Sequence, residues 1–220
     1  MRVTKTMTVT AFATLSVSVS MSPSKGYTGG SFTCSASWDT GAVGPFNLSI
    51  NWGDGTYTDV TGHTSKSISR SHTYNSSGVR TVTVGVSDEY TAGSGSGSAS
   101  VEVRSAVSAS LSADKSSGDV PLAVNFTCAM SGGYAPYSWS LTYGDGGSDS
   151  GSRSSEGEVF PGHTYTKAGS YTVTLTVTDA LGASAAAKSA IRAGALPIPS
   201  NLIIVALPLI TGIILLKVGK

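Results

Sequence analysis

Carboxylate and imidazole side chains are the residues of this sequence best suited to chemistry, and they occur twice in the same arrangement. Asp54 stands between two glycines in a Gly-Asp-Gly turn, and His72 follows it further along the chain. Asp145 and His163 repeat the pair. A carboxylate and an imidazole together could perform acid–base catalysis, and carboxylate oxygens are the ligands that calcium prefers.

The sequence lacks the further residues that calcium binding or acid–base catalysis would require. A calcium loop needs several oxygen ligands at close spacing, and each of these turns offers one carboxylate. Catalysis needs a nucleophile or a second base in a pocket, and the sequence has no nucleophile elbow, phosphate loop or zinc motif. We therefore expect Asp54 and Asp145 to cap tight turns, and His72 and His163 to form structural hydrogen bonds. Calcium binding or catalysis is the alternative.

The remaining acidic candidates also suit a structural role. Asp88 and Glu89 form the densest acidic pair, but adjacent side chains diverge and do not share a ligand. Asp179 stands in the second half of the chain where Asp88 stands in the first. We expect both aspartates to cap the turn before a closing strand. The sequence thus predicts a protein that is not an enzyme and has no cofactor and no metal site.

The elements that position these residues are duplicated as well. Three groups of motifs recur in the same order and at one constant spacing, which indicates two copies of one module. The groups are Ile50–Gly55 with Leu141–Gly146, His72–Tyr74 with His163–Tyr165, and Val86–Asp88 with Val177–Asp179.

The composition favours strands and excludes a nucleic-acid binder. Only 12% of the 220 residues are charged, about half the usual share. Serine, threonine, glycine and valine suit short strands and tight turns. The net charge is +1 without a basic cluster, so the electrostatic signature of nucleic-acid binding is missing.

Apolar residues alternate with serine or threonine in several short segments, which predicts strands with one buried face. Each module shows about seven such segments, and the strongest are Thr81–Val86 and Tyr171–Val177. The Gly/Ser-rich segment Ala92–Ser100 is expected to be a flexible loop before the last strand. The pattern predicts an all-β fold of two tandem antiparallel β-sandwiches. We place the domains at 14–104 and 105–194, with a short joint at Arg104–Ala106.

The first residues exceed what the first domain needs. Odd positions from Val3 to Met21 are mostly apolar and even positions are almost all serine or threonine, a run too long for one ordinary strand. By comparison with the second copy, only Leu15–Ser22 belong to the first sandwich. Residues 1–13 therefore form a surplus arm, which we expect to add as a strand to other structural protein chains. The same residues make a poor signal peptide.

The C-terminal tail, residues 195–220, differs from the rest. Leu202–Leu216 contains no charge, and Lys217 and Lys220 follow it. As a helix, fifteen residues span about 22 Å, rather less than the hydrocarbon core of about 30 Å. We expect a hydrophobic helix kinked at Pro208 that anchors the chain in a membrane, and the alternative is a helix buried in a protein assembly. The anchor residues are Leu202, Ile203, Ile204, Pro208, Ile213, Ile214, Leu215 and Leu216.

The two cysteines and three possible glycosylation sites complete the candidates. Cys34 and Cys128 occupy equivalent places in the two copies, which usually lie far apart, so we expect buried free thiols; inter-chain pairing is the alternative. Asn47, Asn75 and Asn125 begin Asn-X-Ser/Thr triplets and are possible glycosylation sites. Asn125 is the least suitable because a predicted strand contains it.

These motifs resemble the PKD domain, an Ig-like β-sandwich. The likeness covers roughly residues 15–193, and the second copy departs from it by carrying Tyr143 where the first has Trp52. The resemblance implies a structural role for the residues that carry it. They are Trp52, Asp54, His72, Tyr74 and Asp88 in the first copy, and Tyr143, Asp145, His163, Tyr165 and Asp179 in the second.

PKD-like modules occur as spacers in surface proteins, so the resemblance implies a stalk. The sequence predicts a structural surface protein anchored in the membrane of a virion or cell envelope, and exposed on its exterior. The alternative is an adhesion module that binds a glycan or a receptor. Surface aromatic residues gathered in one loop would favour this alternative, and the candidates are Tyr27, Tyr57, Tyr90 and Tyr134.

Overall fold

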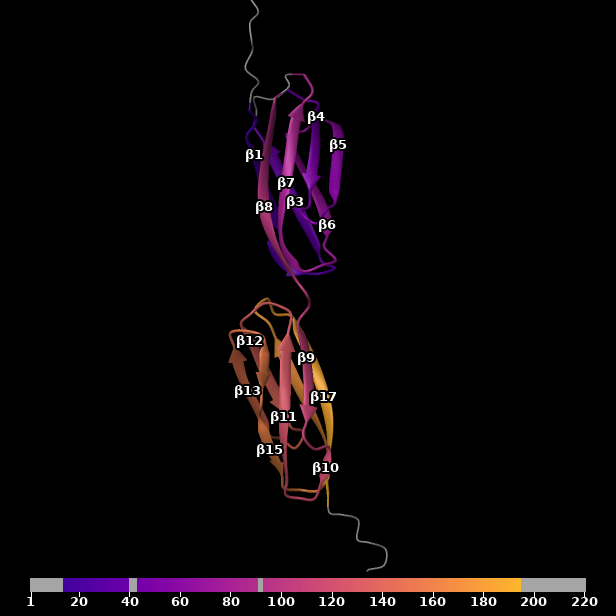
Figure 1. Ribbon diagram of the computed structural model, residues 1–220, viewed down its shortest axis with the longest axis vertical. Helices are drawn as coiled ribbons and strands as arrows, with labels where there is room; N and C mark the ends of the chain where they lie inside the picture. The colour runs from indigo at the N-terminus through magenta and orange to yellow at the C-terminus, as the bar shows by residue number, and fades with distance from the viewer. Residues whose placement is uncertain (1–13, 40–42, 91–92, 195–220) are drawn as a thin grey trace, which may run out of the picture.

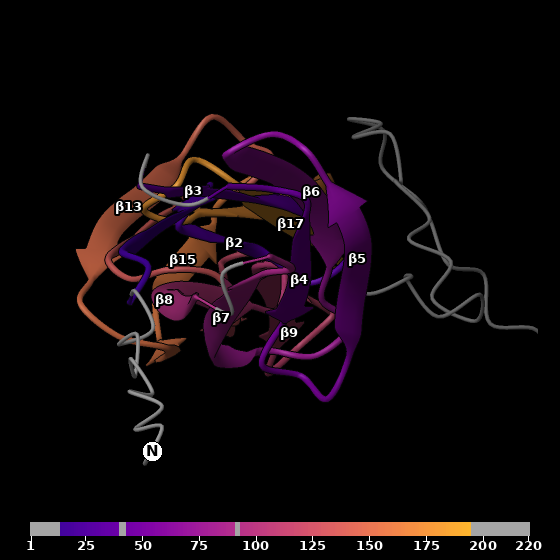
Figure 2. The same ribbon diagram turned by 90° about the horizontal axis from the view of Figure 1, so that it is seen from above.

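The computed structural model describes residues 14–39, 43–90 and 93–194, and all regular structure in these ranges is β-strand. The predicted all-β class is thereby confirmed for the described part of the chain. Figure 1 shows two sandwiches stacked along the long axis, and Figure 2, viewed along that axis, shows their ribbons superimposed. The predicted arm 1–13 and tail 195–220 lie outside the described residues. Within the described ranges, no helix is long and apolar enough to cross a membrane.

The first domain contains eight strands in two sheets. One sheet has the order β1-β3-β6 and the other the order β2-β8-β7-β4-β5. The pairs are antiparallel except β2 with β8, which is parallel. The strands are β1 (Val17–Ser22), β2 (Lys25–Tyr27), β3 (Ser31–Trp38), β4 (Phe46–Asn51), β5 (Tyr57–His63), β6 (Ser67–Thr73), β7 (Gly78–Asp88) and β8 (Ser94–Arg104).

The second domain repeats this architecture with nine strands. One sheet has the order β10-β17-β16-β12-β13, and in the other β11 pairs with β9, β14 and β15. The short parallel pair of β10 with β17 corresponds to β2 with β8. The strands are β9 (Ser108–Ala113), β10 (Ser117–Gly118), β11 (Leu122–Ser131), β12 (Tyr137–Thr142), β13 (Ser148–Arg153), β14 (Gly157–Val159), β15 (Gly162–Tyr165), β16 (Gly169–Thr178) and β17 (Ser184–Ala193).

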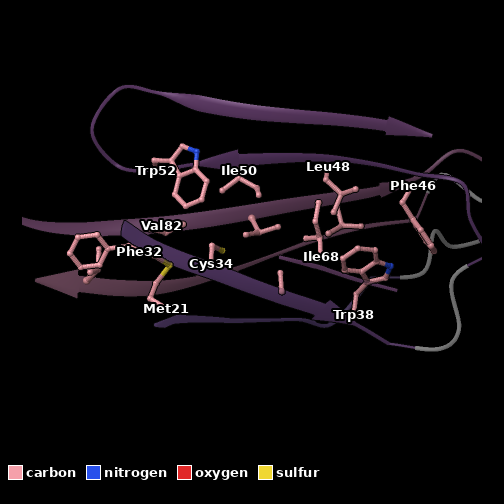
Figure 3. Close-up of a cluster of buried hydrophobic side chains, with 14 of the residues drawn as sticks. Met21, Phe32, Cys34, Trp38, Phe46, Leu48, Ile50, Trp52, Ile68 and Val82 are labelled. Carbon is pink, nitrogen blue, oxygen red and sulfur yellow. The ribbon is translucent and has the colours of Figure 1, made fainter. Parts of the chain in front are cut away.

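Each sandwich has its own core, made by the alternation that is visible in the sequence. In β4, Phe46, Leu48 and Ile50 point inward and are almost fully buried, while the intervening residues face outward. Figure 3 shows these side chains meeting Trp38, Phe32 and others from the facing sheet. The second core is built in the same way, and the two clusters share no residue. Burial of apolar surface therefore stabilises each domain separately, at about 25 cal/mol per Å².

The Gly/Ser-rich segment before the last strand is not the loop that we expected. Ser94–Ser100 belong to the eleven-residue strand β8, which pairs with β7 along ten of its residues. The glycines have a packing reason, because a Cβ at Gly95 or Gly97 would overlap the carbonyl oxygen of Leu15 or Val17. Glycine in a strand often marks such a close approach of another backbone. The segment is thus the place where β1 lies against β8.

Candidate functional site: the joint between the domains

The motif residues of the first domain meet in one cluster beside the Gly-Asp-Gly turn. The His72 ring is stacked on Trp52 with centroids 4.6 Å apart, and its Nε2 lies 2.7 Å from Asp54 Oδ2. Tyr74 packs edge-on against His72 and donates a hydrogen bond from its hydroxyl to the Trp52 carbonyl at 2.9 Å. The cluster therefore ties the turn after β4 to the end of β6.

Asp54 also closes its own turn. Its Oδ1 accepts hydrogen bonds from the Thr56 amide at 3.0 Å and from the Thr56 hydroxyl at 2.6 Å. Partial burial alone would raise the pKa of Asp54, but the hydrogen bonds from Thr56 and His72 outweigh it and lower the pKa to about 2. The carboxylate thus remains charged through most of the acidic range, as a structural acceptor requires.

The second domain repeats the cluster with tyrosine in place of tryptophan. The His163 ring is stacked on Tyr143 with centroids 3.9 Å apart, and its Nε2 lies 2.7 Å from Asp145 Oδ2. Tyr165 donates to the Tyr143 carbonyl at 3.0 Å, which is the contact that Tyr74 makes in the first domain. Tyr143 is buried, and its hydroxyl donates to Asp149 Oδ2 at 2.5 Å.

These clusters suit stabilisation rather than catalysis. Each imidazole is held between an aromatic face, a tyrosine edge and a carboxylate, so the aspartate and the histidine are engaged in structural contacts. The acidic partner of His72 is Asp54, which is already bound to Thr56. In the described ranges, no group of three histidine, cysteine, aspartate or glutamate side chains could hold a metal ion.

The two aspartates at the ends of β7 and β16 cap turns and differ in what else they contact. Asp88 accepts backbone hydrogen bonds from Val43 and Tyr90. Asp179 accepts them from Leu181, Ala183 and Tyr134. Asp179 Oδ2 accepts a further hydrogen bond, at 2.6 Å, from the hydroxyl of Tyr27 in the first domain. This aspartate therefore belongs to a contact between the domains.

Tyr134 is the centre of that contact. Its hydroxyl accepts a hydrogen bond from the Gly26 amide at 3.1 Å and lies 2.7 Å from the Glu102 carbonyl and 2.9 Å from the Gly26 carbonyl. Only 4% of Tyr134 is exposed, although it stands in a loop. Its ring packs edge-on against Tyr27, with centroids 5.7 Å apart. The second domain thus places an aromatic side chain against backbone groups of both β2 and β8 of the first.

Charged side chains surround this tyrosine. The Arg104 guanidinium lies 5.1 Å and the Lys25 ammonium 5.6 Å from the centre of the Tyr134 ring, within cation–π range. Glu102 holds both cations, at 2.8 Å from Arg104 and 3.5 Å from Lys25. Arg104 also donates to the Gly133 carbonyl of the second domain at 3.4 Å. The linker is short, so these contacts fix how one sandwich sits on the other.

The electrostatics of the joint favour a hydrogen bond between a neutral Tyr27 hydroxyl and an ionised Asp179 carboxylate. Burial alone would raise the pKa of Asp179, but the hydrogen bonds from Tyr27 and three backbone amides outweigh it and lower the pKa. The same burial and the neighbouring carboxylate raise the pKa of Tyr27. The tyrosine is therefore protonated and the aspartate ionised over the ordinary pH range, which is the pairing that a charge-assisted hydrogen bond needs.

Residues 108–191 match the PKD domain family model. This match falls within the second sandwich. A search among curated proteins finds no match.

Solved structures with similar folds belong to several kinds of protein. The PKD domain of an M14-like peptidase from a Thermoplasmatales archaeon is 20% identical, covers 40% of this chain and 96% of its own, and has a TM-score of 0.37. Three N-terminal domains of the bacteriophage RB49 outer capsid protein Hoc are 14% identical over 83% of this chain and 71% of theirs, with a TM-score of 0.41. The Yersinia pseudotuberculosis adhesin InvE is 13% identical over 81% and 60%, with a TM-score of 0.34. Similarities this low carry no information on function.

The four tyrosines that could have formed a binding surface are not gathered in one loop. Tyr134 of the second domain and Tyr27 face each other in the joint and are not a free surface. Tyr57 and Tyr90 are exposed, but they lie at opposite ends of β4. Tyr57 pairs with Asn51, the last residue of β4, whereas Tyr90 comes just after Asp88, which pairs with Phe46, the first residue of β4. The prediction missed the joint because a tyrosine in a loop looks the same in sequence whether a second domain covers it or not.

The cysteines and the three asparagines lie as follows. Cys34 and Cys128 are free and buried, one in each core, and burial raises the pKa of both thiols. Asn47 is exposed on β4, and its Oδ1 accepts a hydrogen bond from the Gly62 amide. Asn75 is exposed between β6 and β7, and Asn125 of the second domain donates from its Nδ2 to Asp114 at 3.0 Å.

Proposed function

We propose that this chain is a non-enzymatic structural surface protein in which two β-sandwiches form a rigid spacer. The observation that carries the proposal is the joint, where Tyr134 and the Tyr27–Asp179 hydrogen bond lock the domains end to end. Two domains joined by a short linker would otherwise bend relative to each other. A stalk that must hold a fixed length needs a contact of this kind, whereas two independently acting binding modules do not.

Stiffness of the joint is the property to measure. We expect small-angle scattering and single-molecule FRET between labels on the two domains to give one narrow distance distribution for the unmodified chain. Tyr134→Phe keeps the ring but removes the hydroxyl and its contacts, so we expect the distribution to broaden. Tyr90→Phe is the matched control, since Tyr90 is 72% exposed at the other end of the first domain. Equally broad distance distributions in all three proteins would refute the proposal of a rigid spacer.

The second part of the proposal is the attachment of the spacer to a lipid membrane by residues 202–216, on the exterior of a virion or a cell envelope. It is supported by the fifteen uncharged residues followed by Lys217 and Lys220, which suit the interior side of the bilayer. Flotation of the full chain with lipid vesicles tests it. We expect Ile214→Lys to reduce flotation severalfold and Leu181→Lys, an exposed position of the second domain, to leave it unchanged. Equal flotation of the two variants would contradict membrane attachment by residues 202–216.

The third part is assembly with other structural chains through residues 1–13. It is supported by the alternation of apolar and hydroxyl residues along most of this arm and by its excess over the first sandwich. Strand addition needs an acceptor edge, because the main-chain hydrogen bonds supply the affinity.

A further inference from the structure

The strand β13 leaves one edge of the second domain uncovered. It ends the sheet β10-β17-β16-β12-β13, and all six of its residues pair with β12. Within the described ranges, no strand pairs with its other side. An uncovered edge presents a row of backbone donors and acceptors that another extended chain can bind.

The hydrogen-bond alternation shows which residues present that row. Tyr143 donates from its amide to the Gly147 carbonyl, so the hydrogen-bonded pairs of this hairpin are those between odd-numbered residues. Ser148, Ser150 and Ser152 consequently direct their N–H and C=O groups away from β12. All three residues are exposed.

The equivalent edge of the first domain has a charge and a bulge at places where this edge has neither. In β5, Asp59 occupies the place that Ser150 has in β13. The pairing of β5 with β4 also shifts register between Phe46 and Leu48, and Gly62 of β5 has a positive φ of 66°. Charges and bulges are the means by which edge strands avoid pairing with other chains. The pairing of β13 with β12 shows no register shift, and its three outward positions are serines.

The inner side of β13 offers an apolar contact as well. Trp139 of β12 extends across Gly151, where its ring atoms lie 3.0 Å from the position of a Cβ, and the ring is only partly buried. In the first domain the corresponding pair is Leu48 and Val60, which has no ring reaching over the edge strand. An added strand with an apolar residue on its inner side would pack against Trp139.

We propose that the edge of β13 binds residues 1–13 of a second copy of this chain as an added strand. This inference rests on the assembly part of the proposed function and identifies its acceptor. The arm alternates apolar and hydroxyl residues and carries Arg2 and Lys5 without any acidic residue. Asp149 lies on β13 and Glu156 and Glu158 follow it, so the acceptor side has the opposite charge; Arg153, the one cation there, donates to the Glu158 carbonyl.

The donated residues 1–13 must come from another copy, because they are too few to reach the β13 edge of their own chain. Thr14 lies beside Ser94 at the start of β8, and β8 runs from there to the joint over eleven residues, about 36 Å. Thirteen extended residues span at most about 47 Å. Only about three residues would remain beyond the joint, too few to cover the six of β13. Donation between copies joins two different surfaces and builds rings or open chains.

Sedimentation velocity of the full chain in detergent, over a range of concentrations, tests this assembly. We expect oligomers to grow with concentration in the unmodified chain. Ser150→Pro removes an outward amide while it leaves the bonds to β12 intact, and we expect it to weaken association at least tenfold. Asp59→Pro is the matched control at the equivalent place of β5 and should associate normally. Val9→Pro in the arm should weaken association as Ser150→Pro does.

A second pair of variants covers the case in which proline disturbs folding. Ser150→Lys places a charge on the edge and should prevent pairing, whereas Asp59→Lys should not, and circular dichroism checks that both fold. A chain that stays monomeric at every concentration, or that associates equally well with Ser150→Pro and Ser150→Lys, would overturn the proposal. The spacer is judged separately, since joint stiffness is measured within one molecule and does not depend on this edge.

Discussion

Tryptophan, histidine and aspartate occur in this chain as a packed unit, and their chemistry is used for stability. The His72 ring is stacked on Trp52 and touches Asp54, and the second domain builds the same unit around Tyr143. Stacking and a charge-assisted hydrogen bond each add to the burial of the aromatic surface. We therefore expect single substitutions in these units to affect folding and not a reaction.

Trp52→Ala is expected to lower the free energy of unfolding of the first domain by about 3–5 kcal/mol, because it leaves a cavity where a side chain with 1% exposure was packed. Denaturant titration monitored by circular dichroism measures the loss. Tyr57→Ala, at a residue that is 61% exposed, serves as the control and should change little. An unchanged midpoint for Trp52→Ala would mean that the ring is not part of the core.

Acid is expected to weaken the first domain through Asp54. Its pKa is about 2 in the folded protein, below the ordinary value of about 3.9, so the unfolded chain binds more protons between these two values. The stabilisation is complete above about pH 4 and is lost as the pH falls toward 2. Unfolding midpoints measured between pH 2 and 5 should fall accordingly, and Asp54→Asn should show a shallower slope. If the unfolding midpoint of Asp54→Asn falls with pH as steeply as that of the unmodified chain, the acid sensitivity belongs to other groups.

At the scale of the element, glycine decides how closely two sheets approach. Gly95 and Gly97 in β8 allow the backbone at Leu15 and at Val17, the first residue of β1, to lie where a side chain would otherwise stand. The same residues led us to expect a loop, because a Gly/Ser-rich segment has low strand propensity. Pairing with β7 along ten residue pairs overrides that propensity.

Gly97→Ala is expected to destabilise the first domain by about 1–3 kcal/mol or more, because its methyl group would meet the Val17 carbonyl, which belongs to the backbone and cannot rotate away. Gly85→Ala is the control in the neighbouring strand β7, where the nearest atom, the Ser49 carbonyl oxygen, is 3.9 Å from the new Cβ. We expect the control to be neutral or slightly stabilising, since alanine loses less backbone entropy than glycine. Thermal unfolding of both variants would show whether β1 lies that close.

At the scale of the whole molecule, the joint couples two domains that each have a complete core. The coupling depends on polar groups placed against each other, with Tyr27 on Asp179 and Tyr134 on the edge of β2 and β8. A hydrogen bond to a charged group contributes about 1.5–3 kcal/mol when it is buried. The domains should therefore unfold with partial cooperativity, although neither requires the other for its core.

Tyr27→Phe is expected to reduce this coupling by about 1–3 kcal/mol, because the Asp179 carboxylate loses its donor from the first domain. Differential scanning calorimetry should show the two domain transitions moving apart, while the more stable one keeps its midpoint. Tyr57→Phe, at an exposed residue, is the control. Identical calorimetric traces for Tyr27→Phe and the unmodified chain would show that the hydrogen bond does not link the domains.

Much of the fold could be predicted from local patterns. Alternation in segments such as Phe46–Asn51 indicates a strand with one buried face, because side chains alternate between the two faces of a strand. A structural role of Asp54 and His72 is also predicted from the sequence, because further ligands or nucleophiles are lacking nearby. The path of β8 could not be predicted, since the reason for its glycines is a strand that is distant in the sequence.

Residue order is enough to predict that the described chain is all-β and duplicated, because periodicity and repetition can be read directly from it. Tertiary structure alone decided that Tyr27, Tyr134 and Asp179 form one contact and that β13 has an uncovered edge. Both features depend on which surfaces face each other after folding. Residues separated by 152 and 45 positions meet there, and no local pattern encodes such a meeting.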